Sequence, residues 1–492
     1  MTVLEQPGTH APAHAPSWRP RADAAPLLPD AEPYRVLGAR PDAPTGTKTK
    51  ATRARSTRTG TTRAGSARTG ATRTGTPRAG TAGRDTGTSG LAGEQVAAAP
   101  DAELLRRLYA AVVHGRRFNE QATALTRQGR LAVYPSSRGQ EACQVAAALS
   151  LAEHDWLFPS YRDTLAAVAR GLDPMEVLSL LRGDWHHGYD TRRTRVAPLC
   201  TPLATQLPHA VGLAHAARLK GDEVAALALV GDGGTSEGDF HEALNFAAVW
   251  QAPVVFLVQN NGFAISVPLA KQTAAPSLAH KAVGYGVPGR LVDGNDAVAV
   301  HEVLTEALER ARAGGGPTLV EAVTYRLEAH TNADDATRYR ADAEVEAWRA
   351  HDPVALLERE LRQRDLWDEE AARQVEEAAE EQAAALRSRM NQDPALDPLE
   401  LFAHVYAEPT PQLREQAGRL RAELAAEATA GQTNEYEAGQ TDAHGAGQTD
   451  ENAAGQTNEN ADGQTDDAAR RQSVTGEPAA GGAGGRTGEE TR

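Results

Sequence analysis

Cysteine is scarce in this 492-residue chain, which contains two, Cys143 and Cys200. Neither lies in a CxxC or Cys-His spacing, so the sequence supports neither a disulfide scaffold nor a cysteine-based metal site. No apolar run approaches the roughly 18 residues that a membrane-spanning helix needs. No signal-like segment opens the chain. We therefore expect a cytoplasmic protein with no membrane partner.

Aromatic residues are also few, at 5% of the chain, and both ends are repetitive. Between Pro44 and Arg84 there are ten Lys or Arg and no acid, with an arginine and a glycine recurring every five residues. The far end repeats Gly-Gln-Thr with a period of eight from Gly431. Neither segment has enough apolar residues to form a core, so we predict disordered tails at both ends.

These repeats set the domain boundaries that we expect. Residues 1–95 form the N-terminal tail, with a candidate ordered patch near Leu27 to Leu37. Residues 96–410 form the folded domain, and residues 411–492 form a helical extension followed by the repeat tail. The net charge of the whole chain is −15, of which the basic tract contributes +10 and the tail from Ala428 contributes −8. The remaining residues therefore carry a net charge of −17. An acidic body makes nucleic acid an unexpected main partner.

Two short apolar runs in the middle of the chain end at polar residues flanked by glycine. Val224–Val230 is unbroken and rich in Val, Leu and Ala, as expected of a strand buried on both faces of a parallel sheet. It ends at Gly231-Asp232-Gly233. Pro253–Val258 is a second such run and ends at Asn260-Asn261-Gly262. The pattern predicts two neighbouring strands that each deliver a polar side chain at one end.

Apolar residues at helical spacing separate the two strands, and Asp239 and Glu242 lie where a helix-capping pair would lie. Strand, helix and strand form one βαβ unit, whose right-handed crossover lays the strands parallel. Asp232 and Asn261 therefore leave the sheet at its carboxyl edge, where open α/β sheets bind ligands. The glycines beside them, Gly231 among them, allow close approach of a ligand to the backbone.

A second unit, with strands at Arg290–Val292 and Thr318–Arg326, brings Arg326 to the same edge. Tyr161 and Arg162 end another short apolar run and precede a helix. The fold class is therefore α/β, with a mostly parallel sheet and helices on both faces. The polar segment 329–340 has few apolar anchors and is the kind of loop that is often functional. Helices are also expected at 101–127, 142–151, 296–312, 354–363 and 369–390.

The loop after the first strand is acidic and cannot hold a diphosphate unaided. Magnesium would resolve this, because it is commonly bound by one or two carboxylates together with carbonyl oxygens and substrate phosphates. Asp232 would supply the carboxylate, Asn261 its amide oxygen and Phe263 its backbone carbonyl. A GxxxxGK[ST] P-loop is absent, and the third glycine of a dinucleotide site is missing after Gly233.

Several motifs together resemble the thiamine diphosphate enzymes, and within them the alpha subunit of the two-chain 2-oxo acid dehydrogenases. The resemblance covers about Asp101 to Thr410. GDGGTSEGD and QNNGFAIS resemble the thiamine diphosphate fingerprint, and FPSYRD resembles the element that contacts the diphosphate. TPLATQ resembles the loop that meets the aminopyrimidine, and TYRLEAHTNADDATRYR resembles the phosphorylation-loop region. A thiamine diphosphate-binding fold is thus implied.

The resemblance also implies roles for individual residues. Magnesium would be held by Asp232, Asn261 and the Phe263 carbonyl. Cofactor contacts would come from Tyr161, Arg162, Leu203, Gly231, Gly233 and Arg326, with His330 at the reacting centre. In branched-chain members, Thr201, Thr205 and Gln206 would border a potassium site. Thr331 stands where animal relatives carry a phosphorylated serine, which leaves kinase regulation open.

The implied activity is thiamine diphosphate-dependent oxidative decarboxylation of a 2-oxo acid, with acyl transfer to the lipoyl group of a transacylase. A beta subunit carrying the other half of the site is expected, in an alpha2-beta2 heterotetramer. TPLATQ and NNGFAIS favour branched-chain members, whereas NADDATRY also resembles bacterial pyruvate enzymes, so a pyruvate dehydrogenase alpha subunit is the alternative. From other classes, a magnesium-dependent phosphotransferase and a non-catalytic scaffold stay open; the first would need a γ-phosphate site that the sequence does not show.

Overall fold

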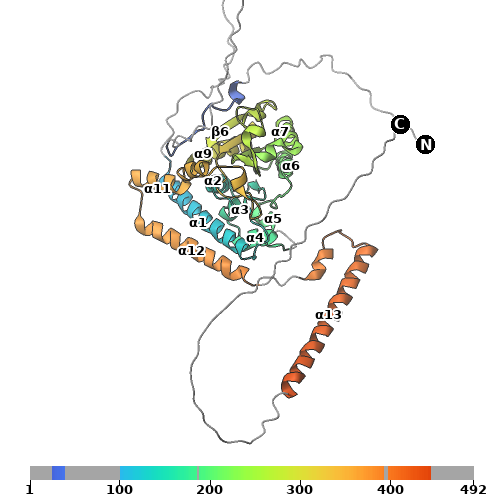
Figure 1. Ribbon diagram of the computed structural model, residues 1–492. Coiled ribbons are helices and arrows are strands. Elements are labelled where there is room, and N and C mark those ends of the chain that lie inside the picture. The colour runs from blue at the N-terminus through green and yellow to red at the C-terminus, as the bar shows by residue number, and fades with distance from the viewer. Residues whose placement is uncertain (1–24, 39–99, 185–187, 393–396, 445–492) are drawn as a thin grey trace, which may run out of the picture. The chain divides into compact units, whose positions relative to one another are not determined.

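The computed structural model describes residues 25–38, 100–184, 188–392 and 397–444 (Figure 1). The basic tract and the Gly-Gln-Thr repeats from Gly447 onward lie outside these residues, so the tail predictions made for them stay predictions. The chain divides into two compact units, Met1–Leu396 and Asp397–Arg492. This division falls before the boundary that we expected at residue 410.

The second unit contains η6 (Pro398–Phe402) and one long helix, α13 (Pro411–His444). This helix begins where we expected a helical extension. It continues further than expected, through the repeats at Gly431 and Gly439, which were assigned to a disordered tail.

Five strands form the sheet of the first unit, in the order β1-β2-β3-β7-β6, and every pair is parallel. The strands are β1 (Trp156–Phe158), β2 (Ala226–Gly231), β3 (Val254–Asn260), β6 (Gly289–Asp293) and β7 (Thr318–Val323). A small antiparallel pair, β4 (Phe263–Ala264) and β5 (Val267–Pro268), follows β3. The predicted α/β fold with a mostly parallel sheet is confirmed.

The direction in which the chain moves across the sheet explains why helices cover both faces. β1, β2 and β3 lie side by side in chain order, whereas β6 lies at the far edge and β7 returns to β3. Because both crossovers are right-handed, the helices after β2 and β6 lie on opposite faces. On one face α7 (Gly238–Trp250) packs with α6 (Gln206–Lys220), and on the other α9 (Ala297–Arg310) packs with α2 (Glu141–Ser150) (Figure 1).

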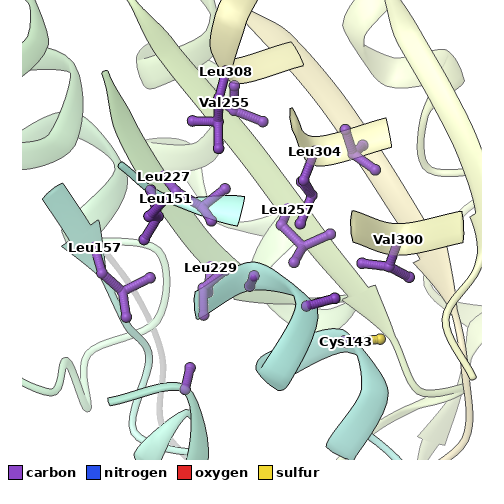
Figure 2. Close-up of a cluster of buried hydrophobic side chains, with 14 of the residues drawn as sticks. Cys143, Leu151, Leu157, Leu227, Leu229, Val255, Leu257, Val300, Leu304 and Leu308 are labelled. Atoms are coloured by element: carbon purple, nitrogen blue, oxygen red, sulfur yellow. The ribbon is translucent and has the colours of Figure 1, made fainter. Parts of the chain in front are cut away.

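Alternate residues of the central strands supply the two cores. Leu227, Leu229 and Leu257 lie in the core that includes Val300 and Leu304 of α9 (Figure 2). Their neighbours Ala228, Val230, Phe256 and Val258 lie in the core under α6 and α7. Burying a side chain of the size of Leu or Phe stabilises the fold by about 1.5–3 kcal/mol. β2 and β3 are thus held from both sides, which fixes the loops at their ends.

Further helices surround this centre. α1 (Ala102–Arg127) packs with α11 (Pro353–Gln363) and α12 (Glu369–Met390) in two clusters of buried apolar residues. Tyr109 of α1 meets Trp367 edge to face at 5.3 Å between ring centroids. The remaining short helices are η1 (Ala25–Leu27), α3 (Thr164–Ala169), α4 (Pro174–Arg182), α5 (Thr191–Thr194), η2 (Gly233–Ser236), η3 (Leu269–Lys271), α8 (His280–Val283), η4 (Ala311–Gly315), η5 (Ala336–Arg338) and α10 (Asp342–Arg349).

The patch near Leu27 to Leu37 is ordered and extends the open edge of the sheet. The Tyr34 N–H donates to Leu291 O at 3.0 Å, and the Asp293 N–H donates back to Tyr34 O at 3.0 Å. The Asp296 carboxylate accepts from the N–H groups of Val36 and Leu37, both at 2.6 Å. Covering β6 in this way removes an exposed strand edge that would otherwise be open to other chains.

Two local predictions are wrong. β7 ends at Val323 instead of Arg326, because its partner β3 ends at Asn260 and the chain turns there through Gly262, which has φ +87°. The Asp239–Glu242 pair does not cap α7, because the N-cap residue is Glu237 and no side chain caps the helix. No helix in the described part of the chain is long and apolar enough to cross a membrane.

Candidate functional site

A cavity of about 230 Å³ opens at the carboxyl edge of β1, β2 and β3. The parallel strands bring together residues that are far apart in the sequence. Of the predicted site residues, the following line the cavity: Tyr161, Arg162, Leu203, Gly231, Asp232, Gly233, Asn261, Phe263 and His330. Arg326 lies just behind them and donates to the Phe263 carbonyl oxygen at 3.4 Å.

Asp232 is the buried carboxylate of the site. It follows β2 directly, and its side chain accepts a hydrogen bond from Gln272 Nε2 at 2.7 Å through Oδ2. Burial raises the pKa of Asp232, and the hydrogen bond from Gln272 opposes that rise. A buried charge needs a compensating partner. A divalent cation beside the carboxylate would favour its charged form, so this position fits a metal ligand.

Asn261 and Phe263 add neutral oxygen atoms beside Asp232. Asn261 Nδ2 donates to Gln140 Oε1 at 2.9 Å, while its Oδ1 accepts from the Phe263 N–H at 3.2 Å. In the described residues, no group of three or more His, Cys, Asp or Glu could hold a metal ion. One carboxylate with amide and carbonyl oxygens is a hard-oxygen donor set of the kind magnesium takes when phosphates supply further ligands.

Two guanidinium groups lie near the cavity: Arg162 lines it, and Arg326 contacts the Phe263 carbonyl behind the lining. Arg162 Nη1 donates to Ser136 O at 2.9 Å, and Arg326 Nη2 donates to Ile265 O at 2.6 Å. Burial lowers the pKa of Arg326, and the charge of Arg162 lowers it further. Tyr161 lies against Arg162, with 5.5 Å between its ring centroid and the guanidinium carbon. An anion between these like charges would relieve their repulsion, which suits a diphosphate.

The two predicted glycines differ in what surrounds them. A Cβ at Gly233 would lie 2.7 Å from the Ala264 Cβ, so close packing requires glycine there. A Cβ at Gly231 would meet nothing within 4 Å, so this glycine faces open space. Leu203 is 46% exposed at the cavity, beside Ala204, which has φ +65°. A non-glycine residue in this left-handed conformation stores backbone strain of a kind found at functional sites.

The loop after Arg326 is better anchored than the sequence indicated. Tyr339 packs on Phe263 with ring centroids 5.6 Å apart, and Arg326 Nη2 donates to its hydroxyl at 2.7 Å. The Asp334 carboxylate accepts from the His330 N–H at 2.8 Å. These contacts correct the expectation of a loop with few apolar anchors. Tyr339 also donates from its hydroxyl to the Asp334 carboxylate, so it supports the acceptor that holds the backbone of His330.

His330 is neutral in this setting. Burial lowers its pKa to about 4, assisted by the charges of Arg162 and Arg326 and opposed by Asp334. Its Nδ1 lies 3.0 Å from Arg162 Nη2, which can only donate. Nδ1 therefore accepts, and the single proton of the neutral ring is on Nε2. His330 thus brings a neutral N–H donor to the cavity wall.

The sequence analysis did not single out three glutamines that contact predicted site residues or one another: Gln140, Gln259 and Gln272. Gln272 binds Asp232, and Gln140 binds both Asn261 and Gln259. A usable signal existed for Gln259, a polar residue inside the fully buried strand β3. For the other two, a glutamine in a loop or at a helix start looks like any surface polar residue.

The residues assigned to a potassium site lie at or just before the start of α6, where Gln206 is the first helical residue and Thr205 precedes it. Gln206 Nε2 donates to Leu229 O at 2.6 Å, while the buried Gln206 Oε1 has no hydrogen-bond partner. The Thr205 hydroxyl donates to Asp239 Oδ2 at 3.1 Å, and Thr201 is exposed. An unpaired buried oxygen is costly, and a cation could satisfy it.

The model of one protein family, described as dehydrogenase E1 component, matches residues 109–398. The chain belongs to this family. It is 50% identical over 323 residues to the 3-methyl-2-oxobutanoate dehydrogenase subunit alpha of Mycobacterium tuberculosis, which covers 66% of this chain and 88% of that relative. It is 40% identical over 278 residues to the pyruvate dehydrogenase E1 component subunit alpha of Staphylococcus aureus, which covers 56% of this chain and 75% of that relative.

These similarities confirm the family that the motifs implied. This E1 chain is an alpha subunit of the thiamine diphosphate-dependent 2-oxo acid dehydrogenase class. The matched residues 109–398 contain every predicted site residue, so the family assignment and the cavity concern the same part of the chain.

We expect His330 in the cofactor-free protein to titrate with a pKa of about 4, below its ordinary value of 6.5. Because the unfolded chain takes up the proton first, the stability associated with neutral His330 is complete above about pH 6.5 and is lost as the pH falls toward 4. Histidine NMR titration, with His330→Gln to assign the resonance, measures this. Arg162→Gln should raise the pKa of His330, and a wild-type titration near 6.5 would contradict the assignment.

Proposed function

We propose that this E1 chain is the alpha subunit of a branched-chain 2-oxo acid dehydrogenase. The observation that carries the proposal is the similarity to the 3-methyl-2-oxobutanoate dehydrogenase alpha subunit, at 50% identity over 88% of that protein. The pyruvate dehydrogenase relative is more distant, at 40% identity over 75% of its length, and supports the alternative substrate. The reaction is oxidative decarboxylation of a 2-oxo acid with acyl transfer to a lipoyl group.

In this proposal the acidic side of the cavity holds magnesium and the basic side holds the diphosphate. Asp232, the Asn261 amide oxygen and the Phe263 carbonyl bind the metal, which suits their oxygen-only donor set. Tyr161, Arg162 and Arg326 face the diphosphate, Gly231 and Gly233 leave backbone accessible, and the Leu203 region meets the aminopyrimidine. When bound, thiamine diphosphate supplies the electron sink that decarboxylation needs.

His330 is the residue that we place at the reacting centre. Its neutral ring and its proton on Nε2 make it a hydrogen-bond donor at pH 7, without the cost of a buried charge. Arg162 and Asp334 hold the ring and the backbone of His330 respectively. A donor held in this way can orient the reacting group during transfer to the lipoyl sulfur.

The alpha chain implies a beta subunit, and we propose an alpha2-beta2 heterotetramer that delivers the acyl unit to a lipoyl-bearing transacylase. Apolar side chains at the cavity support a covering partner: Leu203 is 46% exposed and Ile265 is 55% exposed. Exposed apolar residues grouped at a site mark surfaces that another molecule covers. A cytoplasmic location stays part of the proposal, as does a potassium ion near Gln206.

Asp232→Ala should weaken magnesium-dependent binding of thiamine diphosphate by at least about 100-fold, because changes in groups that only support a metal ligand already cost about 10- to 100-fold. Calorimetric titration of magnesium into the alpha-beta complex with the cofactor present measures this. Asp222→Ala, an exposed carboxylate before β2, is the matched control. Equal binding by Asp232→Ala would refute the metal site. The proposed potassium ion near Gln206 is tested separately by repeating the titration in sodium instead of potassium salts.

The substrate proposal is tested by co-purifying this chain with its beta partner and assaying 3-methyl-2-oxobutanoate and pyruvate with an artificial electron acceptor. We expect kcat/KM to favour 3-methyl-2-oxobutanoate by at least about tenfold, since each extra methylene in an apolar pocket is worth about 1–3 kcal/mol. A preference for pyruvate would establish the alternative. Failure of the two chains to co-purify would count against the heterotetramer.

His330→Ala should reduce acylation of a lipoyl domain by about 100-fold or more, the usual contribution of a positioned proton donor, while cofactor binding stays close to wild type. Single-turnover transfer to an isolated lipoyl domain is the measurement, with calorimetry for the cofactor. His154→Ala removes an exposed histidine outside the cavity and serves as the control. Unchanged transfer in His330→Ala would remove this residue from the reacting centre.

A further inference from the structure

A row of buried side chains connects the metal side of the cavity to the diphosphate side. Asn261 Nδ2 donates to Gln140 Oε1 at 2.9 Å, and Gln140 Nε2 donates to Gln259 Oε1 at 3.0 Å. Gln259 Nε2 then donates to Asp163 Oδ1 at 2.6 Å. All four residues are at most 5% exposed. Water has little access to these groups, so the amides must satisfy one another.

Asp163 stands at the end of this row and is held as a hydrogen-bond acceptor. Its Oδ2 accepts from the Ser160 N–H at 2.7 Å and from the Ser160 hydroxyl at 2.6 Å. Burial raises the pKa of Asp163, and the hydrogen bonds from Ser160 and Gln259 oppose that rise. With three donors around it, the carboxylate has no bond left in which it needs to donate.

The acceptor at one end favours one orientation of every amide in the row, and the Phe263 N–H, which donates to Asn261 Oδ1 at 3.2 Å, favours the same orientation of Asn261. A side-chain amide has a donor NH₂ and an acceptor oxygen, and the two ends are almost equal in shape. Gln259 must turn its NH₂ to Asp163, so its oxygen faces Gln140. Gln140 must then turn its oxygen to Asn261, which leaves the Asn261 oxygen, and not its NH₂, away from Gln140.

We propose that Asp163 is a positioning residue for metal binding: through Gln259 and Gln140 it determines which end of the Asn261 amide is presented as the ligand. This inference rests on the proposed magnesium role of Asn261. It explains why three buried amides and a carboxylate lie under the cavity at a place where apolar residues would pack as well. An NH₂ group in the ligand position could not bind a cation.

The same row also supports the diphosphate side. Gln144 Nε2 lies 3.3 Å from Gln259 Oε1 and 3.3 Å from Arg162 O, so it ties the backbone of Arg162 to the row. Asp163 itself follows Arg162 and holds the turn through Ser160. A single acceptor therefore fixes both the metal ligand and the turn that carries the phosphate-facing arginine.

Asp163→Asn tests the direction of the row with almost no change of shape. If the new amide keeps its oxygen toward Ser160, its NH₂ faces the NH₂ of Gln259. Reversal of Gln259 and Gln140 relieves this contact, at the loss of the bond from Gln144 Nε2 to Gln259 Oε1. Asn261 then turns its NH₂ toward the ligand side and loses the bond that its Oδ1 accepts from the Phe263 N–H. If the new amide reverses instead, the Ser160 N–H loses its acceptor, which costs about 1–3 kcal/mol.

A double variant should restore the direction. With Asp163→Asn and Gln259→Glu together, the carboxylate moves one place along the row. It accepts from the new amide at 163 and from Gln140 and Gln144, as Gln259 Oε1 does now. Gln140 again turns its oxygen to Asn261. A residue that only filled space would not be rescued by moving its charge to a neighbour.

The experiment uses the full chain in complex with its beta partner, stripped of cofactor, and measures by calorimetry the magnesium concentration needed for thiamine diphosphate binding. Asp163→Asn should raise that concentration about 10- to 100-fold, and the double variant should return it close to wild type. Asp155→Asn is the control, since Asp155 is equally buried but accepts from the Ala225 N–H at the amino end of β2. It should lower the melting temperature and leave the magnesium requirement unchanged.

Asn261→Ala separates this inference from the proposed function. If Asn261→Ala binds magnesium as well as wild type, the proposed metal site is wrong. If Asn261→Ala weakens binding while Asp163→Asn does not, or the double variant fails to recover, the positioning role is overturned. Should Asp163→Asn fail to fold, Gln140→Leu removes the acceptor of Asn261 without changing charge, and normal magnesium binding in that variant would overturn the role equally.

Discussion

The structure depends on keeping unlike charges buried and apart at one edge of the sheet. Asp232, Arg162 and the neutral His330 line the cavity, and Arg326 lies behind the lining at the Phe263 carbonyl. Removing such ions from water costs several kcal/mol each, and here they do not form pairs with one another that would repay it. The packing of β2 and β3 on both faces offsets this desolvation cost. A metal diphosphate bound in the cavity would compensate the carboxylate and the guanidinium groups together.

Each of the buried side chains at the strand ends is held by a second, neutral side chain. The strands deliver backbone ends, and the side chains that leave those ends are held by second contacts: Gln272 on Asp232, Gln140 on Asn261, Tyr339 on Arg326. None of these supporting groups carries a charge. Neutral supports orient an ionic ligand without competing for the ion, whereas a charged support would pair with it. In the proposed site, the groups that bind are thus distinct from Gln272, Gln140 and Tyr339, which orient them.

Predictions were correct where neighbouring residues in the chain decide the structure, and wrong where residues far apart in the chain decide it. The strands β2 and β3 and the helix between them were predicted because local hydrophobic pattern decides them, and the shared edge of Asp232 and Asn261 followed from crossover handedness. The end of β7 was wrong because it depends on where β3 stops. The capping pair was wrong because Glu237 is the N-cap of α7, and Asp239 accepts instead from the Thr205 hydroxyl, 34 residues away in the chain.

The sequence by itself determined the α/β class, the order of the polar strand ends and the family that its motifs resemble. Short contiguous segments of the chain are enough to identify each of these features. Only the tertiary structure decided which groups support them. Gln140, Gln259 and Asp163 meet across a separation of 119 residues between Gln140 and Gln259, and the partners of a buried amide cannot be read from its neighbours in the chain. A hydrogen-bond direction is a property of the whole row, and the row exists only after folding.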